Sequence, residues 1–444
     1  MTRRQFFALL ATIIGSGVVI LDGFVVNLAL PSIARDLRAS FAGLQWIVDG
    51  YLLSLSALIL LGGSLGDIFG RKRVYQLGLV GFGLASLLCG LAPNLTILVL
   101  LRVVQGVFGA LLVPGALAII NTNIPEKLRG LAFGRWTAWS GITTVLGPLI
   151  GGYLISIASW RWIFFINIPL VALCMVFTAQ NVNETRDRGS RHVDLPGAAL
   201  AAATLAAITY GLIEGPAKYW SRGIITVLVS GFILGVVFYL VEANTKDPML
   251  KLSLFRSRNF SGVNITTLAM YGGLSGFIFA LVLYLQTTLG YSSVKAGASL
   301  MPISVMLLLL SSRVGALAHK VGPRIFMTLG PLTSAAGMIL LLRLGSGDSY
   351  LNGVFPGVLL FALGLGITVA PLTITVMGSV DASQSGIASG VNNAVSRVAG
   401  LIVVALLGIL GAGQVYHFAI ILCASLLAAA GIISYTLIRN PKPS

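Results

Sequence analysis

Residues 95–120 read LTILVLLRVVQGVFGALLVPGALAII, an apolar run interrupted by one charged residue, Arg102. A helix that crosses a bilayer needs about 20 predominantly apolar residues. Thirteen further runs of this kind occur along the chain, at 6–30, 44–66, 74–91, 131–157, 161–180, 195–213, 223–241, 259–287, 296–312, 324–342, 353–378, 386–410 and 415–437. The sequence therefore predicts an all-α integral membrane protein with fourteen transmembrane helices.

The composition agrees with this fold class. Of 444 residues, 57% are hydrophobic and only 9% are charged, whereas a typical soluble domain has about 25% charged residues. The net charge of +16 would suggest nucleic-acid binding in a soluble protein. Here, however, twenty of the 29 basic residues fall on one side of the predicted membrane and seven on the other. The positive-inside rule then predicts a protein of the cytoplasmic membrane with both termini in the cytoplasm and no nucleic-acid partner.

An internal repeat divides the chain. Residues 63–72 read GSLGDIFGRK, and residues 315–324 read GALAHKVGPR in the same register. Each segment joins the second and third helices of a predicted six-helix set, and repeated halves are typical of transporters. We expect a six-helix bundle over 1–180, linkers and two inserted helices over 181–258, and a second six-helix bundle over 259–444.

Few ionisable residues lie inside the predicted spans, where they are costly and usually functional. A rise of 1.5 Å per residue places Asp22, Asp49 and Arg102 about 12, 8 and 10 Å below the outer ends of their helices. Burial and a neighbouring arginine have opposite effects on the proton affinity of a carboxylate, so this cluster is a candidate proton-coupling site. The alternative is a permanent Asp22–Arg102 ion pair, with Asp49 in external water.

Two further charged residues are candidates. Glu214 ends a predicted helix before a Gly-Pro pair, and a solvated helix end is the favoured interpretation. Arg397 lies mid-helix without an acidic residue near it in sequence, so Asn392, Asn393 and Ser396 are expected to solvate it. An anionic or polar substrate group is one partner that we expect for Arg397, and backbone carbonyls are the other.

The fifth span contains GPLIGG at 147–152. Small residues four apart allow close helix packing, and a proline can kink the helix. No Walker A, HExxH or GxSxG sequence occurs, and the three cysteines are far apart. We therefore expect a protein that is not an enzyme and that has neither a metal site nor a cofactor.

These residues resemble a known family. The segment LDGFVVNLALP at 21–31 is similar to the helix 1 motif of drug:proton antiporters in the major facilitator superfamily. Further segments are similar to motifs of this superfamily or of its fourteen-helix branch: GSLGDIFGRKR at 63–73, LRVVQG at 101–106, GPLIGG at 147–152, WRWIFFINIP at 160–169, DGY at 49–51 and GVNNAVSR at 390–397.

The resemblance implies two six-helix bundles around a central cavity, with alternating access and proton influx driving export. The residues and the resemblance together predict four sets of site residues. Proton coupling is assigned to Asp22, Asp49 and Arg102, and a substrate cavity to Asn27, Asn392, Asn393 and Arg397. A conformational latch is assigned to Gly63, Asp67, Gly70, Arg71 and Lys72, and the antiporter motif to Gly147, Pro148, Gly151 and Gly152.

The leading functional hypothesis is therefore proton-coupled efflux of amphiphilic drugs or antibiotics by a monomer, with the proton gradient as the only energy source. Multidrug members of the family that handle dications often carry an acidic residue in the tenth helix, and the span 296–312 has none, so the comparison with the family disfavours dicationic substrates. One alternative is a narrow exporter of one natural product, amino acid or lipid. Another is a membrane sensor or enzyme without a transport cycle.

Overall fold

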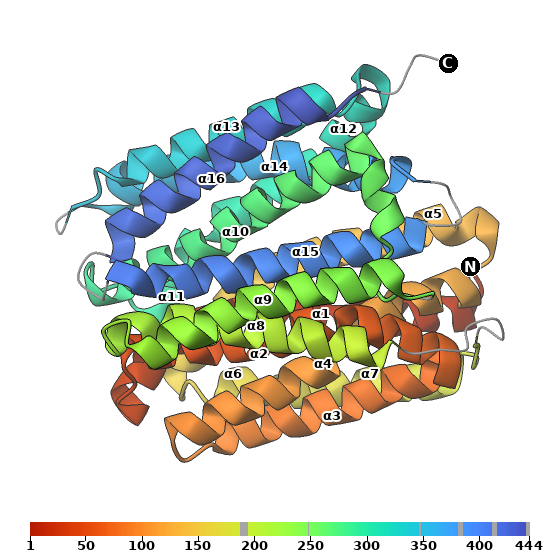
Figure 1. The fold of residues 1–444 in the computed structure, drawn as a ribbon, viewed down its shortest axis with the longest axis horizontal. Helices are drawn as coiled ribbons and strands as arrows, with labels where there is room; N and C mark the ends of the chain where they lie inside the picture. Colours follow the sequence, from red (N-terminus) through yellow and green to blue (C-terminus); the bar gives the residue numbers. More distant parts are fainter. Residues whose placement is uncertain (187–193, 247, 346–347, 381–384, 411–414, 441–444) are drawn as a thin grey trace. The chain divides into compact units, whose positions relative to one another are not determined.

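The computed structural model describes residues 1–186, 194–246, 248–345, 348–380, 385–410 and 415–440 (Figure 1). Contacts divide the chain into two compact units, Met1–Leu250 and Lys251–Ser444. The described parts of both units are helical and contain no strand. The first unit contains α1 (Arg3–Leu37), α2 (Phe41–Phe69), α3 (Arg71–Leu91), α4 (Leu95–Asn123), α5 (Glu126–Ile157), α6 (Trp162–Phe165), α7 (Asn167–Asn181), α8 (Leu195–Ala217) and α9 (Arg222–Asn244).

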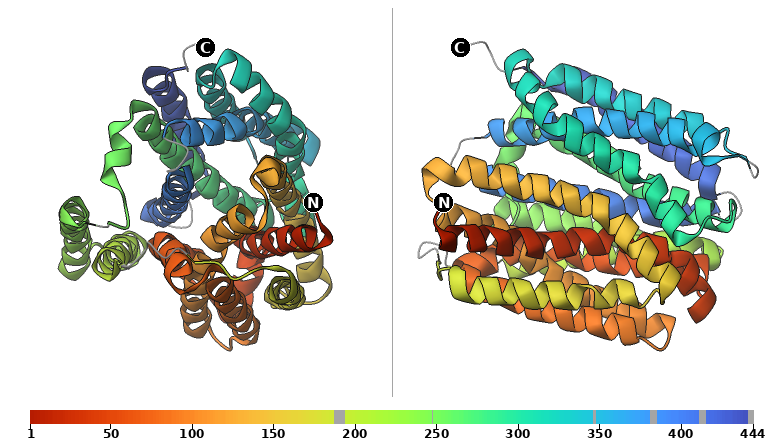
Figure 2. Two further views of the ribbon diagram at one scale, coloured as in Figure 1. Left: turned by 90° about the vertical axis from the view of Figure 1, so that its right-hand side faces the viewer. Right: turned by 180° about the vertical axis from the view of Figure 1, so that it is seen from behind.

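The second unit follows a short 3₁₀ turn, η1 (Leu252–Arg256). Its helices are α10 (Arg258–Thr287), α11 (Ser293–Ser299), α12 (Met301–Val321), α13 (Arg324–Leu341), α14 (Phe355–Gly378), α15 (Ser385–Leu406) and α16 (Val415–Leu437), with a π turn η2 (Tyr350–Val354) before α14 and a 3₁₀ turn η4 (Leu407–Leu410) after α15. Within each unit, the long helices lie side by side with their axes roughly aligned (Figure 2).

The predicted all-α membrane fold is confirmed. Thirteen helical segments of the described residues are long and apolar enough to cross a membrane. Helix α5, whose side chains are described only in part, is a further helix of 32 residues. Several boundaries differ from the predicted runs: 161–180 is divided into α6 and α7, and 296–312 belongs to α11 and α12. The second break occurs at Leu300, two residues before Pro302, because proline has no backbone N–H to donate and is therefore favoured in the first turn of a helix.

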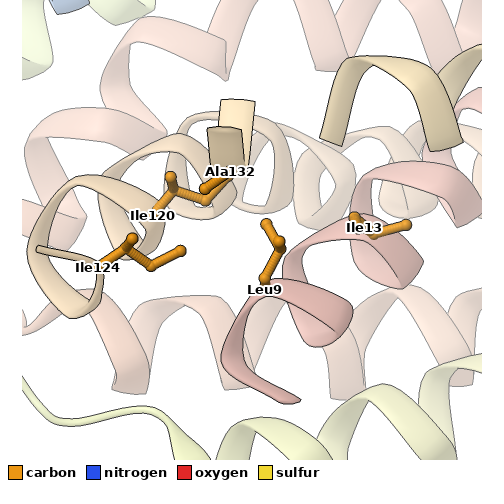
Figure 3. Close-up of a cluster of buried hydrophobic side chains, with 5 residues drawn as sticks. All are labelled: Leu9, Ile13, Ile120, Ile124 and Ala132. Carbon is orange, nitrogen blue, oxygen red and sulfur yellow. The ribbon is translucent and has the colours of Figure 1, made fainter. Parts of the chain in front are cut away.

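Packing in the first unit positions α1 against α4, α5 and α7, while α2 packs against α4. One buried cluster shows how these contacts form: Leu9 and Ile13 of α1 meet Ile120 of α4, Ile124 directly after it, and Ala132 of α5 (Figure 3). Without water to exclude between lipid-embedded helices, such close van der Waals packing is what holds them together. The inserted helices α8 and α9 pack against each other, and α8 also packs against α2.

The two repeated segments adopt the same local backbone. Gly70 precedes α3 with a φ of 109°, and Gly322 precedes Pro323 and α13 with a φ of 97°. Such values favour glycine because they lie in a region that side chains with a Cβ rarely adopt. Each turn is also contacted by a residue that follows a later helix of the same unit, Glu184 after α7 and Asn440 after α16.

Candidate functional site

A fully buried ion pair joins α1 to α4. Arg102 Nη1 donates to Asp22 Oδ2 at 2.5 Å, and the side chains are 1% and 0% exposed. The structure therefore brings together two of the three residues in the predicted cluster. In a low-dielectric interior an ion pair repays its desolvation only when further hydrogen bonds satisfy both groups.

Uncharged polar side chains supply those hydrogen bonds. Gln105 Nε2 donates to Asp22 Oδ1 at 3.0 Å, and Arg102 Nη1 donates to Gln105 Oε1 at 2.7 Å. Asn167 Nδ2 lies 3.3 Å from the same Asp22 oxygen and 3.0 Å from Ser86 Oγ. The carboxylate of Asp22 thus contacts α4 and α7 at once, and through Asn167 it is linked to α3.

The remaining faces of the Arg102 guanidinium are also occupied. Its Nε donates to the carbonyl of Ile47 in α2 at 3.1 Å, and its Cζ lies 4.2 Å from the centre of the Tyr51 ring, which is within the range of a cation–π interaction. Arg102 therefore touches both α1 and α2 through one charged group. A change in the charge of Asp22 would act on both helices through this arginine.

Asp49 does not join this network, contrary to the predicted three-residue cluster. It is fully buried on α2, and neither of its carboxylate oxygens has a hydrogen-bond partner in the part of the chain that the structure describes. The alternative that it sits in external water is also wrong in this structure. A charged carboxylate without a partner is expensive to bury, so Asp49 is the group in this region whose charge is least compensated.

The antiporter motif packs directly against α1, next to Asp22. A Cβ added to Gly151 would lie 2.4 Å from Val25 Cγ1, and one added to Gly147 would lie 3.0 Å from Leu21 Cδ1. Gly152 is also buried, and the side chain of Pro148 lies outside the described residues. The glycines therefore allow α5 to approach α1 more closely than alanine would.

We expect Gly151→Ala to lower the free energy of unfolding by about 1–3 kcal/mol, because the added methyl overpacks the α1–α5 contact. The measurement is denaturant unfolding of the purified protein in detergent. Gly23→Ala on α1 is the matched control, since a Cβ there meets nothing within 4 Å. Equal unfolding free energies for the two variants would contradict the close α1–α5 contact.

Glu214, predicted to be a solvated helix end, lies near the end of α8 with its side chain 19% exposed, and it also has partners within the protein. Its Oε1 accepts a 2.9 Å hydrogen bond from Trp46 Nε1 on α2, and its Oε2 pairs with Lys218 at 3.1 Å. Lys218 Nζ donates to the Tyr210 hydroxyl oxygen and to the Glu214 carboxylate, and these hydrogen bonds raise the pKa of Lys218. Glu214 thus connects the inserted helix α8 to α2 through Trp46, which lies about one helical turn before Asp49.

The predicted latch residues form a compact turn between α2 and α3. Arg71 pairs with Asp67 at 2.7 Å, and Lys72 Nζ donates to the carbonyl of Ala179 at 2.6 Å. A Cβ at Gly63 would be in ordinary contact with Pro114. Sequence reasoning missed Glu184, whose carboxylate accepts hydrogen bonds from the backbone N–H groups of Lys72 and Arg73 at the start of α3, beside Gly70.

The polar residues of α15 are arranged differently from the prediction. Asn392 Nδ2 donates to Asn264 Oδ1 at 3.1 Å and to Thr267 Oγ1 at 2.7 Å, both on α10. Ser396 Oγ donates to the carbonyl of Asn393. The amide nitrogen of Asn392 and the hydroxyl of Ser396 are therefore directed to α10 or to their own helix rather than to Arg397.

Arg397 itself is partly buried. Among the described residues of its own unit, no hydrogen bond or ion pair joins it to another side chain. In the first unit, Asn27 is buried and donates to the carbonyl of Gly23 on its own helix. The side-chain oxygen of Asn27 takes no part in that bond, whereas its side-chain nitrogen donates within α1.

Comparison with known proteins identifies the family. A model described as Major Facilitator Superfamily matches residues 12–404. The chain belongs to this superfamily. Members of the superfamily are membrane transporters, and the chain is a multi-pass membrane protein of this kind.

Superfamily relatives match most of the chain. The puromycin resistance protein of Streptomyces alboniger is 37% identical over 92% of this chain and 82% of its own length. The multidrug resistance protein Stp of Mycobacterium tuberculosis is 32% identical over 92% and 76%. Among solved structures, a peptide transporter POT in complex with sulfate aligns with a TM-score of 0.72 at 14% identity over 98% of both chains. That likeness shows the fold alone.

Proposed function

We propose that the protein exports small amphiphilic drugs or antibiotics across the cytoplasmic membrane in exchange for protons. The observation that carries this proposal is the buried Asp22–Arg102 network, which joins α1, α4 and α7 and also contacts α2 and α3, together with the unpartnered carboxyl of Asp49. The names of the puromycin and multidrug resistance relatives support the export of such compounds. Family membership argues against a sensor or enzyme without a transport cycle.

The proposed coupling step uses Asp22. A proton that binds its carboxylate removes the negative charge opposite Arg102, and the guanidinium then loses the charge-assisted bond between α1 and α4. Release of that proton restores the ion pair. Because Arg102 also contacts α2, the protonation state of Asp22 is communicated to the helix that carries Asp49. Alternating access, with a monomer as the working unit and both termini in the cytoplasm, completes the proposal.

Asp49 is proposed as the second proton-binding group. Asp49→Asn is not expected to lower the free energy of unfolding, since no described group bonds to its carboxylate and the substitution removes an unpartnered buried charge. The same substitution is expected to reduce the number of protons released when substrate binds. The measurement uses a pH indicator in weakly buffered detergent solution. An unchanged proton release in Asp49→Asn would contradict this role.

The substrate class follows from the charges of the second unit. Helix α12 and the preceding α11 carry no acidic residue, whereas α15 presents Arg397 and its amide neighbours. We therefore propose substrates that are neutral, zwitterionic or singly charged. Asn27, Asn392, Asn393 and Arg397 are proposed to line the path of the substrate.

A narrow exporter remains the second candidate, because several relatives are named for one compound each, including puromycin, tetracenomycin C and methylenomycin A. A panel of chemically unrelated compounds, including puromycin, distinguishes the two. Growth protection of an efflux-deficient host against several of them supports the multidrug proposal. Protection against a single compound supports the narrow exporter, and protection against none contradicts both.

A further inference from the structure

A pocket at the start of α1 lies roughly 22–28 Å from Asp22 along the helix axis. It has a volume of about 420 Å³ and is lined by Arg3, Arg4, Phe7, Phe177, Gln180 and Asn181. We propose that this pocket binds the phosphate headgroup of an anionic phospholipid. The proposed topology places the pocket in the cytoplasmic leaflet. The pocket shares no lining residue with the proposed transport site, so lipid binding can be tested without measuring transport.

The charge of the pocket is positive and uncompensated. No acidic residue lines it. Arg3 is exposed, and in the part of the chain that the structure describes, its guanidinium has no ion pair or hydrogen bond and contacts only the Phe7 ring, at 5.8 Å. A guanidinium presents several donors in a planar fork that matches a phosphate group. The pocket therefore offers an anion a charged group that is not already in use.

Two basic residues at this end of α1 and α3, Arg4 and Lys72, bond to backbone carbonyl groups of α7, whereas Arg3 does not. Arg4 Nε donates to the carbonyl of Asn181 at 3.3 Å, and Lys72 donates to that of Ala179. These bonds satisfy carbonyl groups at the C-terminal end of α7, where cations are favoured. Arg4 and Lys72 therefore have a structural function, and Arg3 is the residue whose charge is left for a ligand.

The apolar part of the pocket favours a lipid over a free anion. Phe7 packs against Phe6 and Phe177, with ring centres 5.6 and 5.1 Å apart, and Phe6 is 47% exposed on the surface. Basic groups above an aromatic floor reproduce the order of phosphate above hydrocarbon in a bilayer leaflet. Basic pockets between helices at this level of the membrane are typical sites for anionic headgroups.

The second half of the protein supplies a matched control. Arg258 begins α10 and donates to the carbonyl of Thr436 at the end of α16, as Arg4 does to Asn181 at the end of α7. The residue before Arg258 is Ser257, whereas the residue before Arg4 is Arg3. Arg258→Gln therefore removes an arginine from the corresponding position without changing the proposed lipid site.

The test is a titration of delipidated full-length protein in detergent with phosphatidylglycerol, read by native mass spectrometry. Arg3→Gln is expected to weaken binding of the first lipid about fivefold, from the typical contribution of one basic residue near a lipid surface. Arg3→Lys should retain most of the affinity. Arg258→Gln should leave the affinity of this first lipid unchanged, and phosphatidylcholine should bind more weakly than phosphatidylglycerol.

Two results would overturn the proposal. Equal affinity of the wild type and Arg3→Gln for phosphatidylglycerol would show that Arg3 does not bind the headgroup. Competition by glycerol phosphate at the same concentration as the lipid would indicate a site for a soluble anion. Thermal unfolding of each variant in the same detergent shows whether the fold is retained, and Arg3→Gln alone leaves the Arg4–Asn181 bond intact.

Discussion

Asp22→Asn is expected to abolish uphill export, while movement of substrate down its own gradient continues. The asparagine keeps the size of the side chain and can still accept a hydrogen bond from Gln105 or Arg102. It cannot bind and release a proton, so the exchange of one charge state for the other is lost. In proteoliposomes with an imposed pH gradient, substrate accumulation should fall to the level of protein-free liposomes.

The matched control for this experiment is Asn27→Ala, one and a half turns further along α1, whose amide bonds only within its own helix. This variant should keep the coupling of transport to the pH gradient, even if its affinity for substrate changes. Uphill accumulation by Asp22→Asn at the wild-type level would exclude Asp22 as the coupling carboxylate.

Arg102→Met is expected to give the largest loss of stability, about 3–5 kcal/mol in the free energy of unfolding. The substitution leaves the Asp22 carboxylate buried without its cation, and breaking a buried ion pair on one side has a cost of this size. It also removes the bond to the Ile47 carbonyl and the contact with the Tyr51 ring. Denaturant unfolding in detergent measures the loss.

The double variant Asp22→Asn with Arg102→Gln separates structure from coupling. Because no unpaired charge remains, it should be more stable than Arg102→Met by about 2–3 kcal/mol, yet it should remain uncoupled. The summed effects of Asp22→Asn and Arg102→Gln, each measured alone, should exceed the effect of the double variant, as expected for residues in contact. Additive effects would contradict the direct ion pair.

The sequence predicted the fold well because each membrane-spanning helix corresponds to a long apolar run. It also predicted that Asp22 and Arg102 lie at similar depth, since the rise of a helix converts sequence position into height. Depth alone does not give the rotation of a helix about its axis. That is why Asp49, at the same level, was expected beside Arg102 and lies outside its hydrogen-bond network instead.

Uncharged partners were beyond sequence reasoning for a different reason. Gln105, Asn167 and Ser86 complete the network, but single amides and hydroxyls are common enough in membrane helices to give no signal alone. Gln105 is the exception, because it lies three residues after Arg102 on the same helix face. The hydrogen bond between Trp46 and Glu214 joins residues 168 positions apart, and no local sequence pattern predicts it.

The most direct test of the account is substrate-induced proton movement through the wild-type protein. Proteoliposomes carry a pH-sensitive dye and a preset pH gradient, and a transported compound is added from the panel. With the wild type, the added compound is expected to dissipate the pH gradient. With Asp22→Asn, the gradient is expected to persist. Transport of the compound by the wild type without any change in the gradient would contradict proton coupling.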